Sequence, residues 1–425
     1  MKSDFIVVGS GPGGATVARE LARQGQSVLV LEQGSDAPLR GSLAQMMSIA
    51  ARPGRGLFLN RDASLLLQGA TLGGSSAINF ATAMPPPLAL FARHGVDDLQ
   101  ASLDEVRREV PMAPLPDGLI GPLAQRIGEG ARSLGLAWQK LDKMIVAERC
   151  RSGCWRCAYG CPFGAKWTAR NYLEDAQAAG AQLLSSARVT RVLARDGQAC
   201  GVEFLQHGEL RQALASRVIL AGGGIASPRL LQASGVVSAE PRHFSDPVVA
   251  VMGSVADLDG GAEVPMAAGL HLADAGIMLA DMTLPQPMYA AFAAQVGRFD
   301  RLLAHRRTLT LMVKVRDEIG GRIGPRSVNK SLQASDRAKL AQGVDLAKKI
   351  LTQAGAKNIF KTWHFAAHPG GSVRIGEGVD ANLQSRLKHL YVCDASVIPE
   401  PWGLPPTVTL LCLGKRLARH LGSLG

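Results

Sequence analysis

Residues 4–34 read DFIVVGSGPGGATVARELARQGQSVLVLEQG, and this stretch decides the fold. The apolar, β-branched run at residues 5–8 is typical of a buried parallel strand. It leads into a glycine-rich turn with G-x-G-x-x-G spacing and then into a segment with the apolar stripe of a helix, which Gly25 ends. A second strand, SVLVLE, follows and ends in Glu32. The order of these segments predicts a βαβ unit at the start of a doubly wound α/β domain.

The glycine spacing has a chemical reason. Gly9 allows the tight turn, Gly11 lets a pyrophosphate approach the backbone, and Gly14 lets helix and strand pack closely. Glu32 lies about twenty residues further on, where an acid accepts hydrogen bonds from an adenosine ribose. The motif indicates a dinucleotide site and does not separate FAD from NAD. The alternative is a glycine-rich turn in an ordinary βαβ unit.

Composition limits the class of protein. A chain of 425 residues with 47% hydrophobic residues and 48 glycines predicts two domains or one large composite domain. We expect no membrane span, because no run of 18 apolar residues occurs, and a cytoplasmic location, because the first strand leaves no room for a signal peptide. Export with a partner remains open. The net charge of +12 is not concentrated in a basic, aromatic-rich stretch, so we expect no nucleic-acid partner.

A second glycine-rich loop occurs in LLLQGATLGGSSAINFATAM, residues 65–84. Gly73 and Gly74, followed by Ser75 and Ser76, offer free amides and small hydroxyls that can pass close under a flat cofactor. Downstream of a dinucleotide-binding unit, this composition favours a cofactor contact over a plain linker.

Four cysteines lie within twelve residues as C-x3-C-x2-C-x3-C-P, at Cys150, Cys154, Cys157 and Cys161. Such crowding in a cytoplasmic chain favours metal or redox use over disulfides. Structural zinc usually takes two pairs from either side of a longer loop. A compact run ending in Cys-Pro is closer to iron–sulfur ligation, although the first spacing is one residue longer than the bacterial C-x2-C-x2-C-x3-C-P form. A [4Fe-4S] cluster, a [3Fe-4S] cluster, zinc and reduced structural thiols all remain open.

Several motifs together resemble the glucose–methanol–choline (GMC) oxidoreductase family. GGSSAIN at residues 73–79 matches the family's GGSSxIN loop, and residues 218–231 match a strand followed by AG-x-x-xSP-x-LL. The C-terminal part contains H-x-x-G-[ST] at residues 368–372 and the LYVxDaSvfP pattern from residue 390. The resemblance covers most of the chain except residues 95–148 and 240–330.

The resemblance implies a bound FAD, held without a covalent link because the 73–79 loop lacks the histidine that tethers FAD in some members. His368 falls on the family's catalytic histidine and would act as general base, with His364 as a neighbouring competitor. The residues expected to contact FAD are Gly9, Gly11, Gly13, Gly14, Glu32, Gly73, Gly74, Ser75, Asn79, Val189, Asp394, Ala395, Pro406 and Thr407.

One departure from the family concerns the substrate oxygen. Where the family has Asn or His before the proline of N-P-x-x-T, this chain has Pro405, which offers no side-chain hydrogen bond. The second polar partner is therefore missing or comes from elsewhere. Glu400 and Trp402 lie in the same loop and are candidates for the pocket wall, the alternative being a solvent-facing turn.

The expected architecture is α/β, with a discontinuous Rossmann-like FAD domain (1–94, 185–238 and 364–425) and a helical covering region that contains the cysteines (95–184). A smaller α+β substrate domain (239–363) would be built on an antiparallel sheet. Its polar residues are expected to be surface or satisfied structural groups, namely Asp246, His271, Asp281, Lys314 and Arg316. The modest length suggests a shortened lid, a more open site or a partner subunit.

The sequence thus favours an FAD-dependent dehydrogenase that oxidises a hydroxyl-bearing substrate. Electrons would leave through an iron–sulfur cluster to a redox protein or quinone, which favours a dehydrogenase over an oxidase. Two alternatives stay open: a flavin reductase or electron-transfer subunit without alcohol chemistry, and a zinc-stabilised flavin-binding protein with a structural role.

Overall fold

The computed structural model describes residues 1–50, 54, 56–60, 64–237, 240–366 and 368–424. The first sheet has the strand order β8–β2–β1–β11–β10–β9, and β20 also pairs with β11. Its parallel part consists of β8 (Gln182–Leu184), β2 (Val28–Leu31), β1 (Lys2–Val8), the C-terminal half of β11 (Glu209–Leu220) and β20 (Leu390–Val392). The strands β9 (Ala187–Arg195) and β10 (Gln198–Gln206) extend it as an antiparallel edge. The predicted βαβ unit is confirmed.

Helices cover this sheet. α1 (Pro12–Arg23) links β1 to β2 and packs between α6 (Ala169–Ala178) and α10 (Thr407–Ser423), and α4 (Leu99–Glu109) packs on α10. α7 (Gly223–Ala233) starts directly after β11 and packs against β9. Because β1 and its neighbours are buried on both faces, their sequences are nearly continuous apolar runs.

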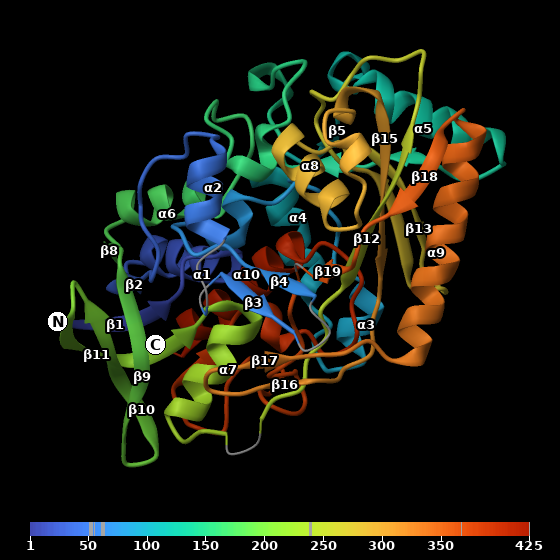
Figure 1. Ribbon diagram of the computed structural model, residues 1–425. Coiled ribbons are helices and arrows are strands. Elements are labelled where there is room, and N and C mark those ends of the chain that lie inside the picture. Colours follow the sequence, from blue (N-terminus) through green and yellow to red (C-terminus); the bar gives the residue numbers. More distant parts are fainter. Residues whose placement is uncertain (51–53, 55, 61–63, 238–239, 367, 425) are drawn as a thin grey trace.

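The second sheet is mainly antiparallel, as predicted, and lies beside the first (Figure 1). Its order is β3–β4–β19–β12–β15–β14–β13–β6, with β18 paired to β12. The central strands are β12 (Pro247–Ser254), β15 (Thr308–Val315), β14 (Ile277–Asp281), β13 (Ala268–Leu272) and β18 (Lys357–Lys361). Four strands join from outside residues 239–363: β3 (Leu57–Leu59), β4 (Leu65–Leu67), β6 (Gln139–Lys140) and β19 (Phe365–Ala366). β19 and β4 pair in parallel, so the sheet is mixed at this edge.

The two faces of the second sheet contact different parts of the molecule. Alternate residues such as Leu311 and Val313 of β15 pack under α9 (Ala334–Gln353) and α5 (Pro122–Ser133), which form the outer layer at the right of Figure 1. The opposite face is rich in methionine and alanine, including Met312. It faces the cavity described below. The period of two in the strand thus separates a core face from a ligand-facing one.

The remaining elements connect these layers. The other α-helices are α2 (Leu43–Ala50), α3 (Leu88–Ala92) and α8 (Gln286–Ala294), and two small hairpins pair β5 (Ala113–Pro114) with β7 (Asp142–Lys143) and β16 (Arg322–Ile323) with β17 (Val328–Asn329). Two 3-10 turns lie in predicted site segments, η1 (Gly74–Ala77) and η4 (Arg156–Tyr159). Within the part of the chain that the structure describes, no helix has the length and apolar character needed to cross a bilayer.

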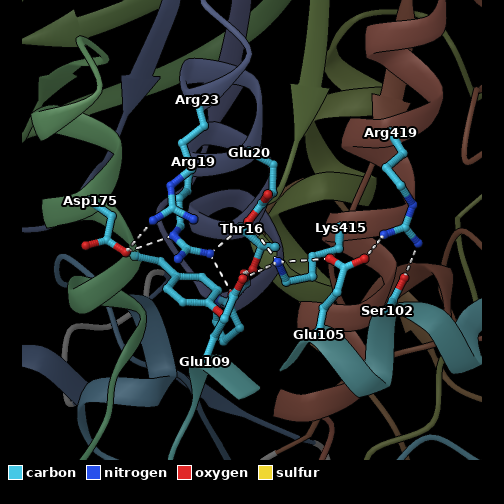
Figure 2. A network of polar contacts seen from close by, with 12 residues as sticks. Thr16, Arg19, Glu20, Arg23, Ser102, Glu105, Glu109, Asp175, Lys415 and Arg419 are labelled. Carbon is cyan, nitrogen blue, oxygen red and sulfur yellow. Dashed lines mark hydrogen bonds and ion pairs between the residues drawn. The ribbon is translucent and has the colours of Figure 1, made fainter. Parts of the chain in front are cut away.

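A charge network joins α1, α4, α6 and α10 (Figure 2). The Lys415 ammonium is 2% exposed and lies 3.0 Å from Glu20, 3.2 Å from Glu105 and 3.0 Å from Glu109. The other oxygen of Glu109 accepts hydrogen bonds from Arg19 at 2.7 Å and from the Tyr172 hydroxyl at 2.6 Å. The network therefore ties segments from both ends of the chain into one layer of helices.

Replacing Glu109 tests this network. Burial raises the pKa of Glu109, but hydrogen bonds from Tyr172, Lys415 and Arg19 outweigh burial and lower the pKa to about 2. The carboxylate therefore contributes stability above pH 4.5, and this contribution is lost as the pH falls from 4.5 towards 2. We expect Glu109→Gln to lower the free energy of unfolding by about 2 kcal/mol at pH 7. Below pH 4.5, the stability of the variant should depend less on pH than that of the wild type.

The measurement is the thermal midpoint of unfolding between pH 2.5 and 7. Glu209→Gln, at an exposed hairpin position, is the matched control and should change the curve little. If the thermal midpoint of Glu109→Gln fell with decreasing pH as steeply as that of the wild type, the network would not stabilise the fold as described.

Candidate functional site

A cavity of about 740 Å³ lies between the two sheets. Its walls come from the turn after β1, the loop at η1, β9, the start of α7, β12 and β15, the loop at residue 368 and the start of α10. The carboxyl ends of parallel strands open on it, which is where doubly wound folds bind ligands. The volume is within the range of ligand and cofactor sites.

The glycine turn after β1 is shaped by close backbone contacts. A Cβ atom on Gly13 would lie 2.0 Å from the carbonyl oxygen of Cys393, and a Cβ on Gly14 would lie 2.2 Å from that of Gly9. A Cβ on Gly11 would meet no atom within 4 Å, and Gly11 lines the cavity. The structure therefore leaves free space at the position where a pyrophosphate would approach the N-terminus of α1.

Glu32 is buried at the end of β2 and lines the cavity. Its carboxylate accepts hydrogen bonds from the amide of Ser10 at 3.0 Å and the amide of Gly34 at 2.7 Å, and also from the Ser10 hydroxyl. Burial raises the pKa of Glu32, whereas the bonds from Ser10 and Gly34 oppose that rise. These bonds fix the carboxylate in a position where its remaining acceptor capacity can serve a ribose.

The loop at η1 meets the start of α10 across the cavity. Asn79 donates from its amide nitrogen to the Thr407 hydroxyl at 3.4 Å, although the two residues are 328 positions apart. Ser75 also lines the cavity, and Gly74 has a positive φ of 57°. The N-terminus of α10 therefore opens on the same cavity as the N-terminus of α1.

Asp394 lies directly after β20 and is buried. Its carboxylate accepts hydrogen bonds from the amides of Gly223 and Ser396, both at 2.8 Å, and from the Ser227 hydroxyl. It therefore fixes the start of α7 as well as lining the cavity. Of the residues expected to contact FAD, the structure places all in the cavity wall except two: Gly14, which packs α1 against β1, and Gly73, whose amide donates to the Ser10 hydroxyl.

His368 lies at the other end of the cavity. Its imidazole is 26% exposed, and its Nδ1 lies 3.3 Å from Oδ2 of the fully buried Asp246. Burial lowers the pKa of His368, and Lys314 lowers it further, while Asp246 opposes the decrease. A neutral imidazole that donates Nδ1–H to Asp246 has Nε2 free to accept a proton.

Asp246 is itself held in place. Its other oxygen accepts a hydrogen bond from the amide of Gly403 at 2.8 Å, which ties the His368 loop to the loop that precedes α10. Its own amide donates to Asp317 at 2.8 Å, and Asp317 forms a buried ion pair with Lys330 at 2.9 Å. The sequence pattern predicts Asp246 to be a surface or satisfied structural group and does not reveal its contact with His368.

Pro405 lines the same cavity as His368. Glu400 and Trp402 do not line it. Glu400 pairs with Arg93 at 3.0 Å and with His94 at 2.9 Å, and Trp402 is buried against Phe91. His364 is not in the described cavity wall either. By contrast, the buried Lys314 of β15 does line the cavity, so it is not a surface group.

The four clustered cysteines line one second, smaller cavity. Cys157 is buried and the other three are half-buried, and none of the seven cysteines, all within the described residues, forms a disulfide. Among the described residues, no three His, Cys, Asp or Glu side chains come close enough to hold a single metal ion. The cysteines therefore share a cavity without converging on one point.

The two cavities are neighbours. Cys157 lines the smaller cavity, and the next residue, Ala158, lines the larger one. The buried Lys166 lines the smaller cavity, and its ammonium donates to the carbonyl oxygens of Cys157 and Asn79, both at 2.9 Å. A short stretch of chain thus connects the cysteines to the loop at η1.

Comparison with known proteins identifies the family. Residues 3–250 match the model described as GMC oxidoreductase for its N-terminal part, and residues 324–414 match the model for its C-terminal part. A GMC-type oxidoreductase of Mycobacterium tuberculosis is 28% identical over 98% of this chain and 75% of its own length. The protein MJ1450 of Methanocaldococcus jannaschii is 26% identical over 98% of this chain and 99% of its own. The long-chain-alcohol oxidase FAO3 of Arabidopsis thaliana is 24% identical over 99% of this chain and 68% of its own.

Solved structures agree with the fold. A formate oxidase variant from Aspergillus oryzae superposes with a TM-score of 0.78 at 16% identity, covering 100% of this chain and 98% of the other. Pyridoxine 4-oxidase from Mesorbium loti superposes with a TM-score of 0.74 at 17% identity, covering 98% and 99%. With both family models matched and the same fold recovered, the chain belongs to the GMC oxidoreductase family and is an FAD-dependent oxidoreductase.

Proposed function

We propose that this protein is a dehydrogenase that oxidises a CH–OH group at His368. The proposal rests on the pair formed by His368 and Asp246, because His368 lines the same cavity as the glycine turn. The bonds of Asp246 to His368 and Gly403 hold the imidazole in one orientation. FAD, when bound, accepts the hydride of the carbinol carbon.

The chain's own contribution is to move one proton. The substrate hydroxyl would donate to Nε2 of His368, which takes its proton as the C–H bond breaks. Asp246 stabilises the imidazolium that results, because its carboxylate lies next to Nδ1. Pro405 cannot supply the second hydrogen bond that the family usually provides from that position.

The residues present fit FAD. The space at Gly11, beside the N-terminus of α1, suits a pyrophosphate, and the buried acid at Glu32 suits a ribose. The N-terminus of α10 suits the negative charge that a flavin ring carries when it is reduced. We propose that the residues predicted from the sequence contact FAD, and that two of them support the site indirectly. Gly14 packs α1 against β1, and the Gly73 amide donates to the Ser10 hydroxyl. We also propose the domain division predicted from the sequence, with FAD held by residues 1–94, 185–238 and 364–425.

We further propose that Cys150, Cys154, Cys157 and Cys161 hold an iron–sulfur cluster. The proposal rests on their spacing, C-x3-C-x2-C-x3-C-P, which is closer to that of iron–sulfur proteins than to the separated pairs of structural zinc sites. All four cysteines line the same small cavity. Such a cluster would accept electrons singly for a redox protein or quinone.

Long-chain-alcohol oxidases of Arabidopsis thaliana are among the similar proteins, which supports a hydroxyl-bearing substrate. The experiment that tests the proposal is anaerobic mixing of the FAD-loaded protein with a panel of alcohols, followed by the flavin absorbance near its visible maxima. Bleaching supports the proposal. Flavin that no alcohol bleaches would favour the reductase or electron-transfer alternative.

Replacing His368 tests the base. We expect His368→Ala to slow bleaching by about 10²- to 10⁴-fold, because the variant lacks the imidazole that takes the hydroxyl proton. In the wild type, the bleaching rate should fall only as the pH drops below a pKa that lies under the ordinary 6.5 of histidine. His364→Ala is the control and should bleach at close to the normal rate. Unchanged bleaching in His368→Ala would exclude this residue as the base.

Replacing Gly11 tests the cofactor site. Its φ of −67° is allowed for alanine, and a methyl group there meets no protein atom. We expect Gly11→Ala to fold with the wild-type thermal midpoint of the apoprotein but to bind FAD at least about 10-fold more weakly. Gly13→Ala is the contrasting variant and should lower the midpoint itself. Normal FAD affinity in Gly11→Ala would place the pyrophosphate elsewhere.

Replacing Cys157 tests the cluster. We expect Cys157→Ser to lower the iron content of anaerobically purified protein and to remove a broad, dithionite-sensitive absorbance beneath the flavin bands. Substrate bleaching of the flavin should persist. Cys200→Ser, outside the cysteine-lined cavity, is the matched control. Wild-type protein that contains zinc and no iron would overturn the assignment.

A further inference from the structure

Five lysines are buried among the residues that the structure describes, and they allow a direct comparison: Lys143, Lys166, Lys314, Lys330 and Lys415. Because an unpaired ammonium is costly to bury, each should have acceptors around it. Lys415 has three carboxylates, and Lys330 has Asp317 and two carbonyl oxygens. Lys143 and Lys166 each donate to three or more oxygens of the protein.

Lys314 is the exception. It is 1% exposed, yet its ammonium makes no hydrogen bond and no ion pair within 4 Å with any residue of the described ranges. Its ammonium is not fully enclosed by protein atoms, and Lys314 lines the larger cavity. Its ammonium therefore has one place to find an acceptor, which is the cavity.

The position of Lys314 follows from the strand register. It lies on β15 opposite Val248 of β12 and Met278 of β14, on the same face as Met312. The cavity wall around it is apolar and includes Met282. A lone cation in an apolar wall selects a ligand that has an apolar body and one negative charge.

The neighbouring charges restrict the ligand further. Asp246, His368 and His271 of β13 are the titratable groups that interact with Lys314, and Asp246 is the one that carries a negative charge. The other cations in the described wall, Arg188 and Arg229, belong to β9 and α7 of the first sheet. A carboxylate would bring one negative charge close to Lys314 and Asp246, whereas a phosphate would bring two, so the single ammonium favours the singly charged ligand.

We propose that Lys314 binds a carboxylate of the substrate, and that the substrates are hydroxy acids with an apolar chain. This assignment rests on the proposed oxidation at His368 and specifies its substrate class. Lys314 thereby supplies a polar contact at an end of the cavity where Pro405 supplies none. The carboxylate anchors the acid, and the hydroxyl-bearing carbon faces His368.

The reaction balances without another reagent. The carbinol C–H bond breaks and its two electrons leave as hydride to the bound FAD, the hydroxyl proton passes to Nε2 of His368, and the C–O single bond becomes a carbonyl. The product is the keto acid, which keeps its carboxylate. Lys314 changes neither its bonds nor its charge during the step.

The test uses the FAD-loaded protein and separates binding from chemistry. Octanoate, which cannot be oxidised in this way, is titrated while the flavin difference spectrum is followed. Anaerobic bleaching is then compared for 2-hydroxyoctanoate and for the neutral 1,2-octanediol. The variants are Lys314→Met, which suits a methionine-rich wall, Lys314→Arg, which keeps the charge, and Lys361→Met, which removes an exposed charge from β18 of the same sheet.

We expect Lys314→Met to weaken binding of octanoate and 2-hydroxyoctanoate by about 10- to 100-fold. Bleaching by 2-hydroxyoctanoate should slow more than bleaching by the neutral 1,2-octanediol, because only the acid loses a charged partner. Lys314→Arg should keep part of the preference for the acid, and Lys361→Met should match the wild type. Equal octanoate affinity in the wild type and Lys314→Met would overturn the proposal, as would a wild type that binds 1-octanol as tightly as octanoate. If no hydroxyl compound bleaches the flavin, the oxidation at His368 fails, and the octanoate titration still decides the role of Lys314.

Discussion

The fold depends on backbone segments that approach more closely than any side chain would allow. At Gly9 a Cβ would lie 2.3 Å from the carbonyl oxygen of Ala221, and at Gly13 it would lie 2.0 Å from that of Cys393. These contacts join the ends of β1, β11 and β20, which are far apart in the sequence. Since the cavity opens at the same strand ends, the packing that closes the first sheet also positions the turn for the cofactor.

The second sheet contributes to the hydrophobic core with one face and lines the cavity with the other. Leu311 and Val313 pack under α9, whereas Met312 and Lys314 face the cavity. Asp246, just before β12, is fixed by the buried pair of Asp317 and Lys330. The second sheet and this buried pair together place the carboxylate that orients His368. Backbone bonds of Gly370 with Phe244 and of Gly371 with Ala395 hold the residues that follow His368.

Much of this could be read from local pattern, and some of it could not. Glycine spacing and apolar runs located the βαβ unit within residues 4–34, and the motif at residues 368–372 singled out His368 as the proposed base, because both patterns are continuous in the sequence. Asp246 was missed because its contact with His368 spans 122 positions. Lys314 is visible in the sequence as a charge inside the apolar run LTLMVKV, but this pattern also fits a satisfied structural lysine. Trp402 was misjudged because packing against Phe91 depends on tertiary structure.

The shared wall between the two cavities has an evolutionary consequence. Consecutive residues, Cys157 and Ala158, face different cavities, and Lys166 bonds to both the cysteine segment and the loop at η1. An insertion or deletion in either segment would displace the other. Changes of length in the two segments are therefore coupled, which limits how either segment can vary while the bonds of Lys166 are kept.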